Sequence, residues 1–182
     1  MAVENNINNL DTPIIDFSLR GVDEKFYSLS DFSVKEILVI IFMCNHCPYV
    51  KAVMKRLVNL QDKLRSKSVQ FIGINPNDTV TYPEDSFKNM ILFHREYNMN
   101  FPYLEDATQL TASKYDAVCT PDIYVYNKER ILKYRGRLDD NWKDESIVTK
   151  HDLEIAIEEI LNGKEPVKEQ IPSMGCSIKW KM

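Results

Sequence analysis

The chain has 182 residues, of which 44% are hydrophobic and 27% are charged, with a formal net charge of −4. This composition is typical of a globular protein with enough chain for one sizeable core, so we expect one domain. The 23 basic and 27 acidic residues leave no basic excess to neutralise phosphates, so nucleic-acid binding is not expected. Five glycines and eight prolines exclude collagen-like and low-complexity chains.

The first ten residues have neither a positively charged start nor an apolar stretch, so we expect no secretory signal. The longest apolar run, residues 37–43, is too short for a bilayer, which a helix crosses with about 20 residues. We therefore expect a cytoplasmic protein that does not bind membranes. In a reducing compartment a close pair of cysteines is more often catalytic or metal-binding than structural.

The first third of the chain has mainly strand patterns. Residues 13–19 and 25–29 predict a β-hairpin, and the β-branched run at 37–43 predicts a strand buried on both faces. Apolar residues at helical spacing then predict a helix over 50–64. A further strand at 69–74 completes a β-α-β unit, which implies a parallel pair of strands.

The second half adds helices and another hairpin. The expected elements are helices at 85–97, 107–115 and 153–161, a short extended piece at 101–104, and hairpin strands at 123–126 and 131–135. Residues 164–182 show no periodicity. We therefore predict a domain over residues 1–163 and an irregular C-terminal tail over 164–182.

The sequence Cys44-Asn45-His46-Cys47 lies between the buried strand and the first long helix. This is the carboxyl end of a parallel strand, where active sites collect. With Asn45 as the N-cap, Cys44 lies just ahead of the helix, where partial positive charge favours a thiolate. We expect Cys44 to be exposed and to attack a disulfide, Cys47 to be shielded and to resolve the mixed disulfide, and His46 to add a cation beside the thiolate.

Three other interpretations of the pair are weaker. A structural zinc site usually has a second close pair, whereas Cys119 and Cys176 are isolated. Haem attachment requires a histidine directly after the second cysteine, and Pro48 occupies that position. A peroxidatic cysteine would follow Thr or Ser by three residues, and Ile41 stands at that offset from Cys44.

Thr120-Pro121 directly precedes the strand expected at 123–126. From this dipeptide alone an ordinary trans turn is the simpler interpretation. A cis bond would instead let the residue before the proline offer its backbone to an extended substrate.

Together these features resemble the thioredoxin superfamily, and nearly the whole chain is similar to its peroxiredoxin-like branch, the redoxin or AhpC/TSA-type proteins. The blocks that carry the resemblance are Cys-Asn-His-Cys-Pro-Tyr-Val (44–50), Tyr-Pro-Glu-Asp-Ser-Phe (82–87), Phe-Pro-Tyr-Leu (101–104), Cys-Thr-Pro-Asp (119–122), Tyr-Arg-Gly-Arg-Leu-Asp-Asp (134–140) and Gly-Cys-Ser-Ile-Lys-Trp (175–180). The resemblance implies a thioredoxin-like α/β fold: a mixed central sheet flanked by helices, with an N-terminal hairpin and a helical insertion.

The resemblance also implies Cys44 as nucleophile, Cys47 as resolving thiol and Pro121 as a cis-proline facing them, with Thr120 and Pro121 binding substrate. The sequence departs from plain thioredoxins, since it has no buried Asp in the strand over 37–43. His46 and water are then the candidate proton acceptors. Cys119 and Cys176 are candidate additional redox thiols.

We therefore predict a thiol–disulfide oxidoreductase that needs neither metal nor organic cofactor. Its predicted partners are protein or small-molecule disulfides and a thiol electron donor. One alternative is a thiol peroxidase in which Cys44 attacks a hydroperoxide and passes through sulfenic acid. The other is a non-catalytic zinc-binding or partner-binding module.

Overall fold

The computed structural model describes residues 2–5, 7 and 9–181. Residues 1, 6 and 8 of the N-terminal segment and residue 182 of the predicted tail lie outside this description. The strands are β1 (Ala2–Glu4), β2 (Ser18–Gly21), β3 (Phe26–Ser28), β4 (Ile37–Phe42), β5 (Val69–Asn75), β6 (Tyr103–Glu105), β7 (Cys119–Thr120), β8 (Asp122–Tyr126), β9 (Leu132–Gly136) and β10 (Met174–Ser177). The α-helices are α1 (Pro48–Leu64), α2 (Phe87–Glu96), α3 (Leu110–Lys114) and α4 (Asp152–Leu161), with 3-10 turns η1 (Leu29–Phe32), η2 (Arg65–Lys67), η3 (Pro83–Asp85) and η4 (Glu145–Ile147).

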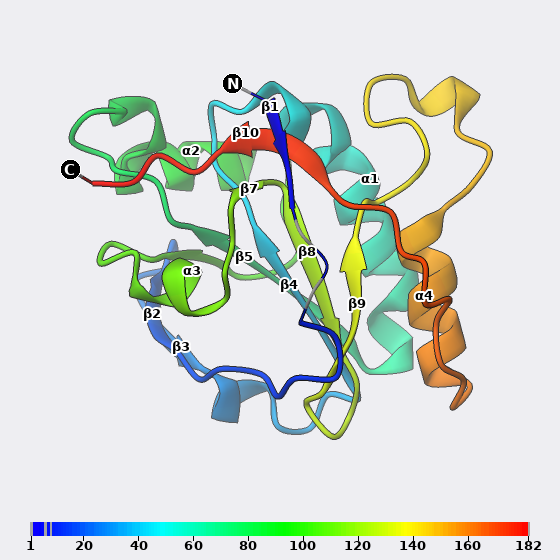
Figure 1. Ribbon diagram of the computed structural model, residues 1–182. Coiled ribbons are helices and arrows are strands. Elements are labelled where there is room, and N and C mark those ends of the chain that lie inside the picture. The colour runs from blue at the N-terminus through cyan, green and yellow to red at the C-terminus, as the bar shows by residue number, and fades with distance from the viewer. Residues whose placement is uncertain (1, 6, 8, 182) are drawn as a thin grey trace.

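A mixed seven-stranded sheet of order β3-β2-β6-β5-β4-β8-β9 forms the centre of the molecule (Figure 1). β4 and β5 pair in parallel, as the β-α-β pattern predicts, and β4 pairs antiparallel with β8. All six residues of β4 are buried, because the strand is central and both of its faces are covered. The predicted α/β architecture is confirmed.

Two apolar layers enclose this sheet. Side chains of α1, α2 and α4 pack on one face, and side chains of η1 and α3 pack on the other. The helical insertion between β5 and β6 thus adds α2 to the same face as α1. None of the helices in the described residues is long and apolar enough to cross a membrane.

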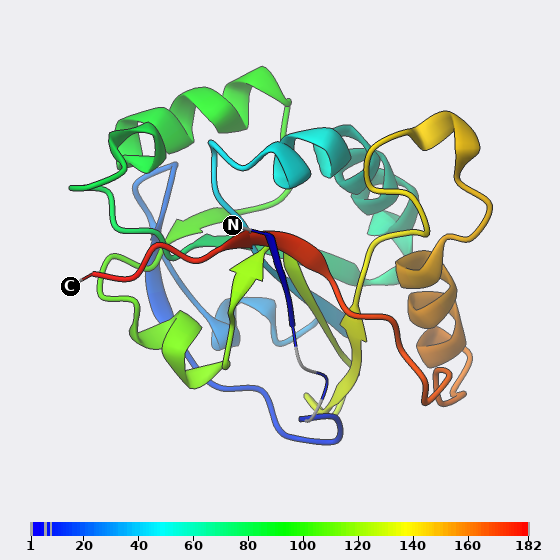
Figure 2. The same ribbon diagram turned by 45° about the horizontal axis from the view of Figure 1, so that its top comes forward.

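The predicted irregular tail is wrong for Met174–Ser177, which form β10 in a second, three-stranded sheet of order β1-β10-β7. The sequence does not reveal this strand, because it is only four residues long and the burial of its side chains does not alternate cleanly. Figure 2 shows β10 running past the end of β7 and close to the start of α1. The tail therefore returns to the carboxyl end of β4, where the cysteine pair lies.

Candidate thiol active site

The loop between β4 and α1 carries the cysteine pair. The expectation that Asn45 caps the helix is wrong: Cys47 is the N-cap, and Pro48 is the first helical residue. Proline fits there, because the amide that it lacks has no partner within the helix. Cys47 rather than Cys44 is therefore the thiol at the positive end of the helix dipole.

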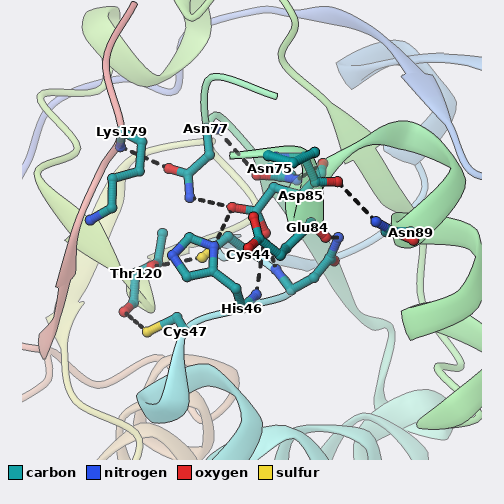
Figure 3. Close-up of polar contacts among 12 residues, drawn as sticks. Cys44, His46, Cys47, Asn75, Asn77, Glu84, Asp85, Asn89, Thr120 and Lys179 are labelled. Carbon is teal, nitrogen blue, oxygen red and sulfur yellow. Dashed lines mark hydrogen bonds and ion pairs between the residues drawn. The ribbon is translucent and has the colours of Figure 1, made fainter. Parts of the chain in front are cut away.

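The structure brings both thiols against the residue before Pro121. The Thr120–Pro121 bond is cis, which confirms that prediction. Cys44 Sγ lies 3.3 Å from Thr120 Oγ1, and Cys47 Sγ lies 3.1 Å from the Thr120 carbonyl oxygen (Figure 3). Both cysteines have 0% exposed surface, so the expectation of an exposed Cys44 is wrong.

The two thiols differ strongly in acidity. A hydrogen bond from the Cys44 thiol outweighs the effect of burial and, with a further hydrogen bond from the Cys176 thiol, lowers the pKa of Cys47 to about 5. The same Cys44–Cys47 hydrogen bond, burial and the nearby Asp85 carboxylate raise the pKa of Cys44 well above its ordinary value. The surroundings favour the thiolate on Cys47 over Cys44, because the helix N-terminus favours charge at Cys47 and Asp85 disfavours it on Cys44.

Asp85 is the functional residue that sequence reasoning missed. It is fully buried, and its carboxylate accepts hydrogen bonds from the backbone amides of Asn45 (2.7 Å) and His46 (3.2 Å) and from Asn77 Nδ2 (2.7 Å). It thereby fixes the cysteine loop from the side of the helical insertion (Figure 3). The only sequence signal was its place in the block 82–87, since nothing local marks it as buried beside a cysteine.

His46 faces Asp85. Its Nδ1 lies 2.6 Å from Asp85 Oδ2, and its ring stacks on Tyr82 at 5.8 Å between centroids and 8° between planes. A sulfur of Cys44, a ring nitrogen of His46 and a carboxylate oxygen of Asp85 all lie within 4.8 Å of one another. These are ligand types that zinc accepts, but the Asp85 oxygens already accept hydrogen bonds from several donors.

The two remaining cysteines occupy different environments. Cys119 is buried in β7, and its thiol points to the carbonyl oxygens of Pro121 (3.6 Å) and Ser173 (3.8 Å). Burial raises the pKa of Cys119 far above its ordinary value, which is the behaviour of a packed thiol. Cys176 is only partly buried, and it contacts Cys47 from β10.

A surface pocket of about 250 Å³ lies beside the cis-proline. The apolar part of its wall includes Pro121, Val53 of α1, Trp142 and Met174. Trp142 is held by the ring of Tyr49 at 4.1 Å between centroids. The pocket could receive a side chain of a partner beside Pro121.

Two of the solved structures that this chain resembles match it along almost their full lengths. An uncharacterized conserved protein from Geobacillus kaustophilus is 43% identical with a TM-score of 0.94, and the match covers 100% of this chain and 97% of that one. A hypothetical protein from Sinorhizobium meliloti 1021 is 34% identical with a TM-score of 0.92, and the match covers 98% and 97%.

A more distant match shows the fold alone. The thioredoxin domain of a thiol-disulfide oxidoreductase from Bacteroides vulgatus is 14% identical with a TM-score of 0.67, covering 84% of this chain and 98% of that one. The search among curated proteins gives no significant match. The model of the AhpC/TSA family matches residues 10–135, more than half of the chain. The protein has a thioredoxin-like fold and belongs to the AhpC/TSA family.

Proposed function

We propose that the protein is a thiol–disulfide oxidoreductase that works through Cys44 and Cys47. The observation that carries this proposal is the pair of thiols on either side of Thr120, one of them with a pKa of about 5. A thiolate at neutral pH beside a second thiol is what disulfide exchange requires. Its substrates are protein or small-molecule disulfides. A thiol donor in a reducing compartment then reduces the Cys44–Cys47 disulfide again.

The acidity of the pair reverses the roles expected from sequence. The Cys47 thiolate attacks a disulfide sulfur, forming a mixed disulfide and releasing the first substrate thiolate. Cys44 then loses its proton and attacks Cys47, releasing the second substrate thiol and closing the Cys44–Cys47 disulfide. The imidazole of His46, hydrogen-bonded to Asp85, lies next to Cys44 and is the base that accepts its proton, in the place of the Asp that β4 lacks.

Trypsin separates the Cys44–Cys47 pair from the other two cysteines, which allows a direct test. Cleavage after Lys and Arg places Cys44 and Cys47 in peptide 36–51, Cys119 in 115–128 and Cys176 in 169–179. One equivalent of a disulfide substrate should convert 36–51 to its internally oxidised form and release two substrate thiols. A wild-type protein that keeps both thiols in a series of glutathione redox buffers would refute the proposal.

The roles are tested in a Cys176→Ser background, so that only the pair itself reacts. There Cys44→Ser should accumulate a mixed disulfide on Cys47, whereas Cys47→Ser should accumulate none. Cys119→Ala is the matched control, because Cys119 is buried in the same region, and it should keep exchange activity. A mixed disulfide that forms only on Cys44 would restore the roles expected from sequence.

Membership of the AhpC/TSA family supports peroxide reduction as a second candidate function. The residue three positions before Cys47 is Cys44, so the Thr or Ser of a peroxidatic motif is missing. Hydrogen peroxide consumption with a thiol reductant separates the candidates. Oxidation of Cys47 to sulfenic acid in the Cys44→Ser variant at peroxidase rates would favour the second.

A zinc-binding module is the remaining candidate, and the proximity of Cys44, His46 and Asp85 is the observation in its favour. Metal analysis of protein purified under reducing conditions decides it. About one zinc per chain, lost in Asp85→Asn and accompanied by unreactive thiols, would replace the redox proposal.

A further inference from the structure

The C-terminal strand β10 lies across the residue that precedes the cis-proline. It pairs antiparallel with β7, with Cys176 opposite Thr120 and Ser177 opposite Cys119. An extended partner adds to a sheet through its main-chain hydrogen bonds, and the backbone of Thr120 beside the two thiols is where such a partner would pair. This chain's own tail therefore occupies the place of an extended substrate.

The strand is fixed in this place on both sides of Cys176. The hydroxyl of Ser173 donates to the Gly136 carbonyl at 2.6 Å, and the amide of Asn5 donates to the Ser173 carbonyl. Beyond the strand, the carbonyl of Lys179 accepts from the Asp78 amide at 2.8 Å and its amide donates to Asn77 at 2.9 Å. Cys176 is thus presented to the cysteine pair by an ordered segment.

The strand also decides which sulfur an external molecule meets. Cys44, Cys47 and Cys119 have no exposed surface, whereas Cys176 is partly exposed. Cys176 also packs against the buried cluster that contains Cys44 and Cys47, and its thiol hydrogen-bonds to Cys47. One thiol therefore touches both the buried pair and the solvent.

We propose that Cys176 is a third exchange thiol, which carries disulfides between the buried Cys44–Cys47 pair and external thiols or disulfides. This inference rests on the proposed function of the pair. It adds the route by which the pair exchanges with its partners while β10 stays in place.

The internal exchange is redox-neutral, and the external thiols supply the two electrons that reduce the pair. In the oxidised protein the Cys176 thiolate attacks Sγ of Cys47. The bond between Cys47 and Cys176 forms as the bond between Cys44 and Cys47 breaks, and Cys44 leaves as a thiolate that takes up the proton released by Cys176. An external thiol then attacks the exposed sulfur of Cys176, and a second one releases that mixed disulfide as an external disulfide. By the reverse steps a substrate disulfide passes inward.

The first test removes the Cys44 thiol, so that Cys47 can form an internal disulfide only with another cysteine. The full-length Cys44→Ser variant, treated at low protein concentration with one equivalent of glutathione disulfide, should form an internal cross-link between tryptic peptides 36–51 and 169–179. No cross-link between 36–51 and 115–128 is expected, because the Cys119 thiol points to carbonyl oxygens.

The second test measures the route in the intact pair. Reduced glutathione should regenerate the two thiols of peptide 36–51 in oxidised Cys176→Ser on the order of tenfold to a hundredfold more slowly than in wild type, because the internal attack is lost. Cys119→Ala should match wild type. An absent cross-link in Cys44→Ser, or an unchanged rate in Cys176→Ser, would overturn this inference while the oxidation of 36–51 in wild type still upholds the proposed function.

Discussion

Gly175 approaches Thr120 so closely that a Cβ atom at this glycine would lie 2.1 Å from the Thr120 carbonyl oxygen. The next nearest atoms are the carbonyl carbon of Thr120, at 2.5 Å, and the nitrogen of Pro121, at 3.0 Å. All three are backbone atoms, which cannot rotate out of the way as the end of a side chain can. Only glycine lets β10 lie on the cis-proline peptide and bring Cys176 to Cys47.

Gly175→Ala should therefore push β10 away from β7 and uncover Cys47. We expect a higher rate of Cys47 alkylation by a bulky maleimide, read from peptide 36–51 after digestion, and a loss of folding stability from the broken pairing. Met174→Ala is the matched control, since this neighbour is 41% exposed. Equal labelling rates in both variants would show that β10 does not cover the thiol.

The low pKa of Cys47 should be visible in the thiolate absorbance of the reduced protein. We expect a titration step with a midpoint near pH 5, which Cys47→Ser removes and Cys119→Ala leaves in place. The expected cause is the hydrogen bond from Cys44, so Cys44→Ala should move the step to higher pH. A step that survives Cys47→Ser would place the thiolate on another cysteine.

The same shift predicts how stability depends on pH. A pKa that is lower in the folded than in the unfolded protein stabilises the fold above the unfolded pKa, and this stabilisation is lost as the pH falls through the folded value. The reduced protein should therefore lose stability relative to Cys47→Ser as the pH falls from about 8.5 to about 5. Cys44, whose pKa is raised, opposes this trend only above its unfolded pKa. Urea unfolding at several pH values measures the difference, and parallel curves would contradict it.

Asp85→Asn should loosen the cysteine loop while keeping the shape of the side chain. The side-chain NH₂ of the new asparagine would face the donors on Asn77 and His46. A buried donor without an acceptor lowers the free energy of unfolding by about 1–3 kcal/mol. Removal of the carboxylate should also lower the pKa of Cys44, because the charge of Asp85 raises it. Urea unfolding and thiolate titration test the two effects. Glu84→Gln removes the same charge from the exposed neighbouring residue and should change neither.

A buried ion pair fixes the loop that carries Trp142 beside the pocket. Arg56 of α1 pairs with Asp139, and its guanidinium donates to the carbonyls of Asn141 at 2.9 Å and Trp142 at 2.6 Å. Asp139→Ala leaves a buried charge without its partner, which costs about 3–5 kcal/mol.

The control for this variant is Glu154→Gln, which breaks the surface pair between Glu154 and Lys63 and should cost no more than about 1 kcal/mol. Denaturant unfolding compares the two. A cost for Asp139→Ala as small as that of the control would mean that solvent already reaches Arg56.

Local sequence patterns predicted most of the helices and strands, because each pattern reflects one physical requirement of its element. The β-branched apolar run at 37–43 predicted a strand covered on both faces, and β4 is completely buried. The stripe along 50–64 predicted α1, which begins at Pro48. The cap was misplaced by two residues, since both Asn45 and Cys47 can precede a helix and only the path of the loop onto Asp85 selects between them.

The sequence by itself determined the α/β fold, the strand-to-helix position of Cys44 and Cys47 and, through the resemblance, the cis bond before Pro121. Each depends on neighbouring residues or on a motif. Tertiary structure alone decided the surroundings that shift the pKa of each thiol, because burial, the helix end and Asp85 act from three separate segments. It also decided that β10 returns to Thr120, since a four-residue strand carries too little periodicity to reveal a partner more than fifty residues away.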